Sequence, residues 1–231
     1  KKTNLIVFGT RPEAIKMAPL VRGFLNDDSF VTKVCVTAQH REMLDQVLDF
    51  FEITPDYDLN VMKPNQNLYS LTATIIENMK EVLEEVKPDY VYVHGDTTTS
   101  MAVGIAAFYS GAKVCHIEAG LRTYDRQYPF PEEFNRQLTG KIADYHFAPT
   151  ELSKTNLLKE NTASQNILVT GNTVIDALLY GIEKVNSDKF IDPEIEELKK
   201  TLDFSKKIVL VTGHRRENHG EGLLNICSAL K

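Results

Sequence analysis

The sequence has no tryptophan, only three cysteines and no long apolar run. No apolar stretch approaches the ~18 residues that a membrane-spanning helix needs. The apolar run "LIVF" near the start is too short for a signal peptide. Cys35 and Cys115 lie in apolar runs that are typical of strands, and Cys227 leaves the count odd. We therefore expect buried, reduced thiols in a soluble, cytoplasmic protein with no membrane partner.

Motifs for bound cofactors and metals are missing as well. The sequence has no zinc-ligand spacing, no G-x-S-x-G, no P-loop lysine motif and no Cys-x-x-Cys. The first apolar run ends at Gly9, where a dinucleotide-binding turn would show G-x-G-x-x-G. Here Gly9 is followed by "TRPE" and, one helical turn later, by Lys16. The sequence therefore predicts neither a cofactor nor a metal, and the first turn needs another explanation.

A basic surface is missing too. The 231 residues carry a net charge of −6, with a pI near 5.6, so a nucleic-acid partner is not expected. With 42% hydrophobic and 25% charged residues, the composition is that of an ordinary globular protein.

What the sequence does have is a regular alternation of short apolar runs and longer amphipathic patterns. Several runs, such as "LIVF" and "KIVLV", are apolar on both faces, as parallel strands covered by helices on both sides should be. We predict strands at 4–8, 33–37, 90–94, 112–117, 145–148, 166–169 and 207–212. We predict helices near 13–26, 40–51, 67–86, 98–110, 132–143, 151–159, 173–184 and 193–202. This order predicts an α/β fold with a Rossmann-like, doubly wound parallel sheet.

A domain boundary is expected in the polar region around "NSDKFIDPEIEELKK". We assign 1–171 to an N-terminal Rossmann-like domain and 172–205 to a linker with helices. The stretch "KKIVLVTGHRREN" then repeats the form of residues 1–13, so 206–231 is interpreted as the start of a second, truncated domain. One strand and one helix cannot bury a core of their own. Within the first helix, Pro19 predicts a kink or the end of a first segment.

Polar side chains beyond the carboxyl ends of the strands are the candidates for a site. Thr10 and Glu13 match a helix capping box, which alone could explain both. Arg11 and Lys16 flank a helix N-terminus, whose free N–H groups favour an anion, so they predict a phosphate site.

Three acidic residues follow other strands or begin helices. Asp96 begins a predicted helix and could be its cap or a functional group. Glu118 ends the apolar strand "KVCHI", where an unpaired charge is costly, so we expect it to be functional. Glu132 begins a helix, where acidic residues are favoured in any case. If all three share one cleft, at least one pKa should be raised.

Among the histidines, His214 is the best functional candidate because it follows a predicted strand beside two arginines. His94, His116 and His146 lie in or beside predicted strands. We expect these three histidines to be buried in the core and hydrogen-bonded there.

Taken together, these residues resemble the non-hydrolysing UDP-N-acetylglucosamine 2-epimerases of bacteria. The stretches "FGTRPEAIKMAPL", "VTAQHREMLDQVL", "VHGDTTT", "HIEAGLRT", "PFPEEFNRQLTG", "TGNTVIDAL" and "VTGHRREN" are similar to that family's motifs and stand in its order. The resemblance implies two Rossmann-like domains, as in GT-B glycosyltransferases, with the active site between them. It also implies a cytoplasmic homodimer that acts on UDP-N-acetylglucosamine.

The resemblance assigns roles residue by residue. Asp96, Glu118, Glu132 and His214 are implied as catalytic, and Arg11, Lys16, Asp96, Glu118 and His214 as substrate-binding. The implied reaction eliminates UDP, forms a 2-acetamidoglucal and adds UDP back to give UDP-N-acetylmannosamine for cell-surface polysaccharide. We expect this chain alone to be inactive, because the second domain is only begun.

Two other interpretations stay open at this point. One is a hydrolysing relative or a GT-B glycosyltransferase, either of which would release UDP in net amounts. The other is a fragment that binds a sugar nucleotide without turnover.

Overall fold

The computed structural model describes residues 1–37, 41–62, 66–211 and 220–230. The chain divides into two compact units, Lys1–Glu183 and Lys184–Lys231. The division falls inside the predicted linker. That residues 206–231 begin a second domain stays a prediction.

The first unit contains a sheet whose described pairings are all parallel. The strands are β1 (Lys2–Phe8), β2 (Phe30–Val36), β3 (Tyr57–Asp58), β4 (Tyr90–His94), β5 (Lys113–Ile117), β6 (Tyr145–Ala148) and β7 (Ile167–Val169). Among the described residues they form one seven-stranded sheet in the order β3-β2-β1-β4-β5-β6-β7. The predicted α/β class with a Rossmann-like parallel sheet is confirmed.

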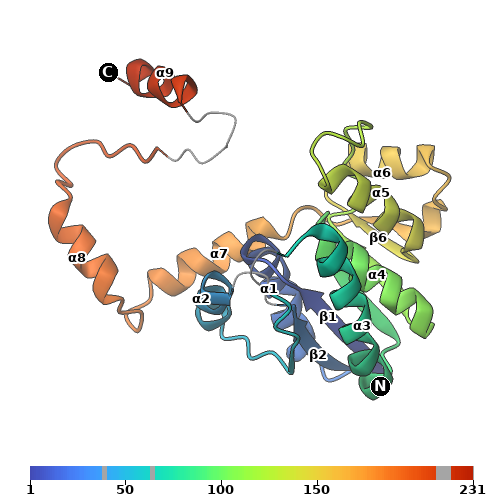
Figure 1. Ribbon diagram of the computed structural model, residues 1–231. Helices are drawn as coiled ribbons and strands as arrows, with labels where there is room; N and C mark the ends of the chain where they lie inside the picture. Colours follow the sequence, from blue (N-terminus) through green and yellow to red (C-terminus); the bar gives the residue numbers. More distant parts are fainter. Residues whose placement is uncertain (38–40, 63–65, 212–219, 231) are drawn as a thin grey trace. The chain divides into compact units, whose positions relative to one another are not determined.

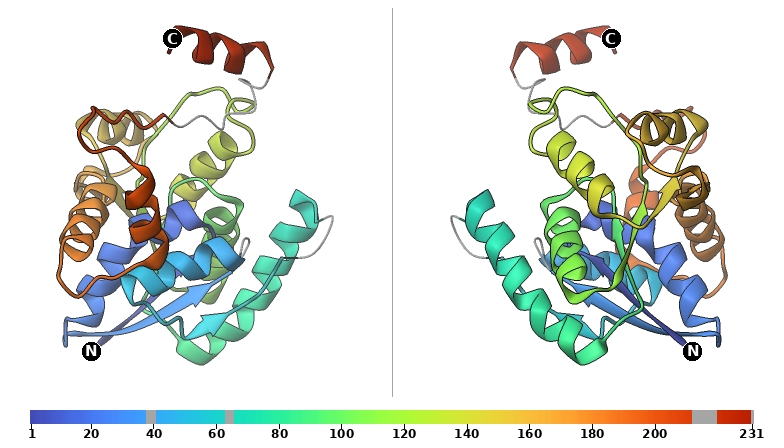
Figure 2. Two further views of the ribbon diagram at one scale, coloured as in Figure 1. Left: turned by 90° about the vertical axis from the view of Figure 1, so that its left-hand side faces the viewer. Right: turned by 90° about the vertical axis from the view of Figure 1, so that its right-hand side faces the viewer.

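The helices of the first unit lie on both faces of this sheet (Figures 1 and 2). They are α1 (Arg11–Leu25), α2 (Arg41–Phe51), α3 (Leu68–Val86), α4 (Thr98–Ser110), α5 (Glu132–Ile142), α6 (Glu151–Lys159) and, up to Glu183, α7 (Val174–Val185), with a short 3-10 turn at Ser164–Asn166. The second unit has α8 (Pro193–Thr201) and α9 (Glu221–Ala229). None of the described helices is long and apolar enough to cross a membrane.

Alternate residues of β1 supply two separate cores. Ile6 and Phe8 pack with α1 and α2, whereas Leu5 and Val7 pack with α3 and α4. All four side chains are at most 1% exposed. A strand buried on both faces must be apolar at every position, which is why the run "LIVF" contains no polar residue. Cys35 and Cys115 belong to these two cores, are free, and have pKa values that burial raises to about 12.

Three details differ from the sequence predictions. The strand expected at 207–212 is not formed over 207–211, and position 212 lies outside the described residues. A strand needs a hydrogen-bonded neighbour, and Val209 and Leu210 are 78% and 87% exposed. β3 was not predicted, because its two residues are too few for a pattern. Finally, α1 does not end at Pro19 but continues to Leu25, so of the two alternatives predicted there only a kink stays a prediction.

Candidate functional site

The order of the strands creates a switch point between β1 and β4. The chain leaves β1 towards β2 and β3, then returns to pair β4 with the other edge of β1. Ligands of open α/β sheets bind at such points, beyond the carboxyl ends of the strands. The predicted site residues therefore belong here: Lys16 lies in α1 after β1, Asp96 follows β4, and Glu118 follows β5.

The turn after β1 is held by a capping box, as predicted. The Thr10 side chain accepts from the Glu13 N–H, and the Glu13 carboxylate accepts from the N–H groups of Gly9 and Thr10. The other Glu13 oxygen accepts from the Thr97 and Ser100 hydroxyls at 2.6 and 3.2 Å. Burial raises the pKa of Glu13 and these hydrogen bonds lower it, with a net upward shift. Glu13 thus connects the N-termini of α1 and α4.

Gly9 is the single glycine that this turn requires. A Cβ at Gly9 would lie 2.0 Å from the Thr37 hydroxyl and 2.7 Å from the Thr99 hydroxyl. These contacts leave no room for a side chain. The glycine therefore serves the packing of β1 against its neighbours.

Lys16 contacts both carboxylate oxygens of Glu118. Its Nζ donates to Glu118 Oε1 at 2.9 Å and to Oε2 at 2.7 Å. Glu118 is 12% exposed and has φ +61°, so its backbone adopts the left-handed conformation that is uncommon for a residue other than glycine. Asn172 Nδ2 also donates to Glu118 Oε2, at 2.7 Å. The predicted cost of burying Glu118 is thus offset by a cation and an amide.

Asp96 is not the cap of α4. Thr97 fills that position, because its side chain accepts from the Ser100 N–H. The carboxylate of Asp96 is instead 3.3 Å from Arg136 Nη2, and Asn135 Nδ2 donates to its backbone carbonyl at 3.0 Å. Burial raises the pKa of Asp96, against the opposing charge of Arg136 and with support from Glu132 and Glu118. A raised pKa in this carboxylate group is what the sequence predicts.

Asp96, Glu118, Glu132 and Lys16 line one pocket of about 410 Å³. Its described lining comprises Thr10, Pro12, Glu13, Lys16, Leu68, Leu71, His94, Asp96, Thr97, Thr98, Glu118, Pro131, Glu132 and Asn135. Arg11 is exposed at the first position of α1 and lies outside this described lining. His214 lies outside the described residues.

His94 also lines the pocket, which the sequence did not indicate. Its Nε2 is 3.8 Å from Glu118 Oε2 and has no hydrogen-bond partner among the described residues. Burial lowers the pKa of His94 to about 4 although Glu118 opposes the shift, so the imidazole is neutral at pH 7. His116 and His146 are buried too, and each leaves its Nδ1 without a partner in the described part of the chain. The three histidines are therefore buried in the core as expected, and His116 Nε2 contacts the Gly95 carbonyl at 2.7 Å, but one ring nitrogen of each has no partner among the described residues.

Asn172, Arg136 and His94 are the site residues that sequence reasoning missed. A signal for Asn172 existed, because it lies in the segment that follows β7, which ends at Val169, and ligand-binding residues are expected there. Arg136 lies inside α5, and its position there gives no sign that it faces Asp96. His94 looks like any polar residue at the end of a strand.

The described lining of the pocket combines carboxylates with the ammonium group of Lys16 and the neutral imidazole of His94. Carboxylates can accept protons and stabilise a cationic carbon, and a lysine can stabilise a phosphate. Within the described residues, no three His, Cys, Asp or Glu side chains are grouped as metal ligands would be. The arrangement suits acid–base chemistry on an anionic substrate.

Comparison with known proteins gives one consistent family. Residues 24–231 match the family model described as UDP-N-acetylglucosamine 2-epimerase. The UDP-N-acetylglucosamine 2-epimerases of Salmonella borreze and Escherichia coli K12 are 60% and 58% identical to this chain over 98% of its length. The chain spans about 60% of the length of each of these relatives.

Two solved structures similar to this chain come from the same family. The UDP-GlcNAc 2-epimerase of Neisseria meningitidis, bound to UDP-GlcNAc, is 54% identical and superposes with a TM-score of 0.90, over 99% of this chain and 61% of that one. The enzyme of Methanocaldococcus jannaschii, in complex with UDP-GlcNAc and UDP, is 33% identical with a TM-score of 0.78, over 87% of this chain and 54% of that one. With the family model matching most of its length, this chain belongs to the UDP-N-acetylglucosamine 2-epimerase family.

Proposed function

We propose that this chain is part of an enzyme that interconverts UDP-N-acetylglucosamine and UDP-N-acetylmannosamine without a redox cofactor. The observation that carries the proposal is that Asp96, Glu118 and Glu132 line one pocket together with Lys16, at the switch point of the sheet. Because the chain spans about 60% of its relatives' length, the activity is proposed for an enzyme of the relatives' length that contains it. We call this the full-length enzyme.

The reaction has to remove a hydrogen from C2 that no adjacent carbonyl acidifies. In the proposed sequence, UDP leaves with the electron pair of the C1–O bond, and C1 becomes oxocarbenium-like. The C2 hydrogen is then acidic, and a carboxylate accepts it to give a 2-acetamidoglucal. Return of a proton to the opposite face of C2, and of UDP to C1, completes the inversion. Carboxylates stabilise a similar cation in glycoside cleavage.

The predicted site residues have proposed roles in these steps. Asp96, Glu118 and Glu132 share the proton transfers and the stabilisation of the cation, while Arg11 and Lys16 bind the diphosphate. Lys16 contacts Glu118 at 2.7 Å, so its charge can reach both the carboxylate and a phosphate beside it. His214, on the positions not described, is proposed as a further diphosphate contact. The homodimer, the cytoplasmic location and the supply of N-acetylmannosamine for surface polysaccharide stay predictions.

The decisive experiment is proton NMR of UDP-N-acetylglucosamine with the full-length enzyme in deuterated water. We expect UDP-N-acetylmannosamine to appear with deuterium at C2, because the abstracted proton exchanges with solvent before it is returned. Retention of the original hydrogen in the product would rule out this mechanism. Net release of UDP would favour a hydrolysing enzyme or a glycosyltransferase, and binding without any turnover would favour a binding protein.

Arg11 gives a second prediction, on binding. Arg11→Ala should weaken UDP binding to the full-length enzyme by ~1.5–3 kcal/mol, the scale of hydrogen bonds to charged groups, or about 10- to 150-fold in Kd. Isothermal titration calorimetry measures this directly. Arg126→Ala removes the same charge from an exposed loop position and should leave Kd unchanged. Equal Kd values for Arg11→Ala and the unmodified enzyme would remove Arg11 from the phosphate site.

A further inference from the structure

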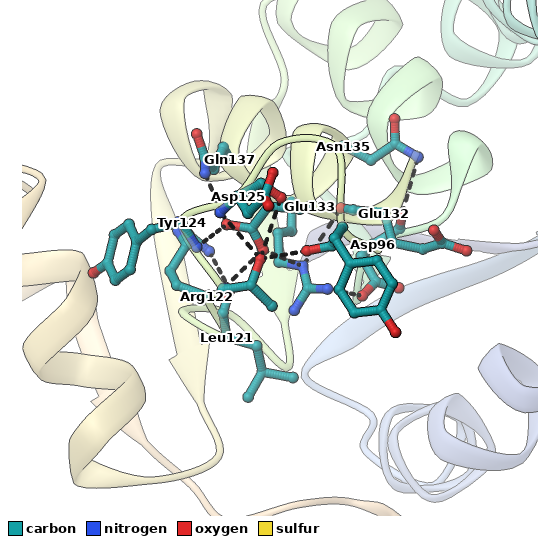
Figure 3. A network of polar contacts seen from close by, with 12 residues as sticks. Asp96, Leu121, Arg122, Tyr124, Asp125, Glu132, Glu133, Asn135 and Gln137 are labelled. Atoms are coloured by element: carbon teal, nitrogen blue, oxygen red, sulfur yellow. Dashed lines mark hydrogen bonds and ion pairs between the residues drawn. The ribbon is translucent and has the colours of Figure 1, made fainter. Parts of the chain in front are cut away.

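Arg136, in α5, contacts two acidic side chains, Asp96 and Glu133, which are labelled in Figure 3. Its Nη2 is 3.3 Å from Asp96 Oδ2, and its Nε is 3.2 Å from Glu133 Oε2. The same Nε also donates to the Glu132 backbone carbonyl at 3.4 Å. Only 11% of the Arg136 side chain is exposed. An arginine this buried is held by its partners, and its fork geometry fixes their orientation.

Glu133 is anchored independently of Arg136. Its carboxylate accepts from the N–H groups of Thr123 and Tyr124 at 3.0 Å each and from Gln137 Nε2 at 2.7 Å. The Glu133 side chain is fully buried. Burial raises its pKa, but these hydrogen bonds and the charge of Arg136 bring the pKa below its ordinary value. Glu133 is therefore a fixed anion that holds Arg136 through Nε, while Nη2 contacts Asp96.

Asp96 is bound by α5 through its backbone as well. Asn135, beside Arg136 in the sequence, donates to the Asp96 carbonyl. Glu132, the first residue of α5, lines the pocket that Asp96 lines. One helix thus fixes the backbone and carboxylate of Asp96 and carries the neighbouring acidic group.

We infer that Arg136, held by Glu133, is the positioning residue that sets the orientation and charge of the Asp96 carboxylate. This inference rests on the role proposed above for Asp96. The charged groups that face Asp96 are Arg136, Glu132, Glu118 and Lys16. A guanidinium is always protonated, so Arg136 takes no part in proton transfer. Its effect is to lower the pKa of Asp96 against burial and two neighbouring acidic groups, and to hold the carboxylate at the pocket that it lines.

The test on this chain is a ¹³C NMR titration of the Asp96 carboxyl, assigned with Asp96→Asn. Arg136→Gln removes the charge and should raise the pKa of Asp96 by about 1–3 units, the usual effect of a paired arginine on a carboxylate. Arg126→Gln removes an equal charge from an exposed position and should leave the titration unchanged. A folded Arg136→Gln chain in which Asp96 titrates as before would overturn the inference.

Kinetics of the full-length enzyme give the second readout. Arg136→Gln should lower kcat by about 10²-fold, the scale for a misplaced catalytic group, with little change in KM, and should move the acidic limb of the kcat profile to higher pH. If Arg136→Gln does not fold, the deciding variant is Arg136→Lys, because it keeps the positive charge but loses the planar guanidinium that contacts two carboxylates at once. An unchanged kcat in Arg136→Lys would then overturn the inference.

The two proposals fail in distinguishable ways. If Arg136→Gln raises the pKa of Asp96 but leaves the rate of C2 deuterium exchange unchanged, the effect of Arg136 on Asp96 is supported and the role proposed for Asp96 is contradicted. Absence of C2 exchange in the unmodified enzyme would contradict the proposed function, while the NMR titration would still decide the part played by Arg136.

Discussion

Asp96→Asn and Glu118→Gln are each expected to reduce the turnover of the full-length enzyme by ~10²-fold or more. An amide keeps the shape of the carboxylate but cannot accept the C2 proton or stabilise a cationic C1. In Asp96→Asn, the side chain also no longer neutralises Arg136, which lies 3.3 Å away. In Glu118→Gln, Lys16 loses the anion that it contacts at 2.7 Å. The rate of C2 deuterium exchange, followed by NMR, measures the loss.

Matched variants separate a catalytic loss from a general effect of charge. Asp28→Asn and Glu81→Gln make the same chemical changes at exposed positions and should keep normal turnover. UDP binding, measured in parallel, shows whether the pocket remains formed. Turnover within a few-fold of normal in both Asp96→Asn and Glu118→Gln would refute the assigned roles.

The stability of the first unit is expected to fall steeply as the pH drops below neutrality. His94, His116 and His146 are buried, and burial lowers their pKa values to about 4, about 3 and about 4. In the unfolded chain each imidazole titrates near 6.5, so between about pH 6.5 and 4 the unfolded state binds more protons. The free energy of unfolding therefore decreases as the pH falls through this window.

The expected decrease in the free energy of unfolding is large. From pH 7 to about pH 4.5, each histidine should remove roughly 2 kcal/mol, or about 6 kcal/mol for the three. Glu13 and Asp96 act in the opposite direction, because their raised pKa values stabilise the folded state as they take up protons. Urea unfolding at the two pH values measures the difference.

A substitution identifies the source of this pH dependence. His116→Gln removes one of the three titrating groups, so its free energy of unfolding should vary less with pH, whatever its stability at pH 7. His116 Nε2 contacts the Gly95 carbonyl at 2.7 Å, and the Gln amide can donate a hydrogen bond as well. An unfolding free energy that does not change between the two pH values would contradict the prediction.

The sequence by itself determined the fold class and much of the site. Apolar residues at every position of "LIVF" can be satisfied only by a strand covered on both faces, and this predicted the doubly wound sheet. The spacing of Thr10 and Glu13 determined the cap of α1, because a capping box is closed by residues three apart. The ends of successive strands located Lys16, Asp96 and Glu118, since all strands of a parallel sheet end at the same edge.

Only the tertiary structure decided which charged side chains form ion pairs with one another. Lys16 and Glu118 are 102 positions apart, and no periodicity links them. Asp96 could have capped α4, but Thr97 does so, and the freed carboxylate faces Arg136 from another helix. Whether a buried carboxylate is paired, and whether its pKa rises, depends on neighbours that the order of the strands brings together. Local pattern fixes the elements, whereas the electrostatics of the pocket arise from contacts between elements far apart in the chain.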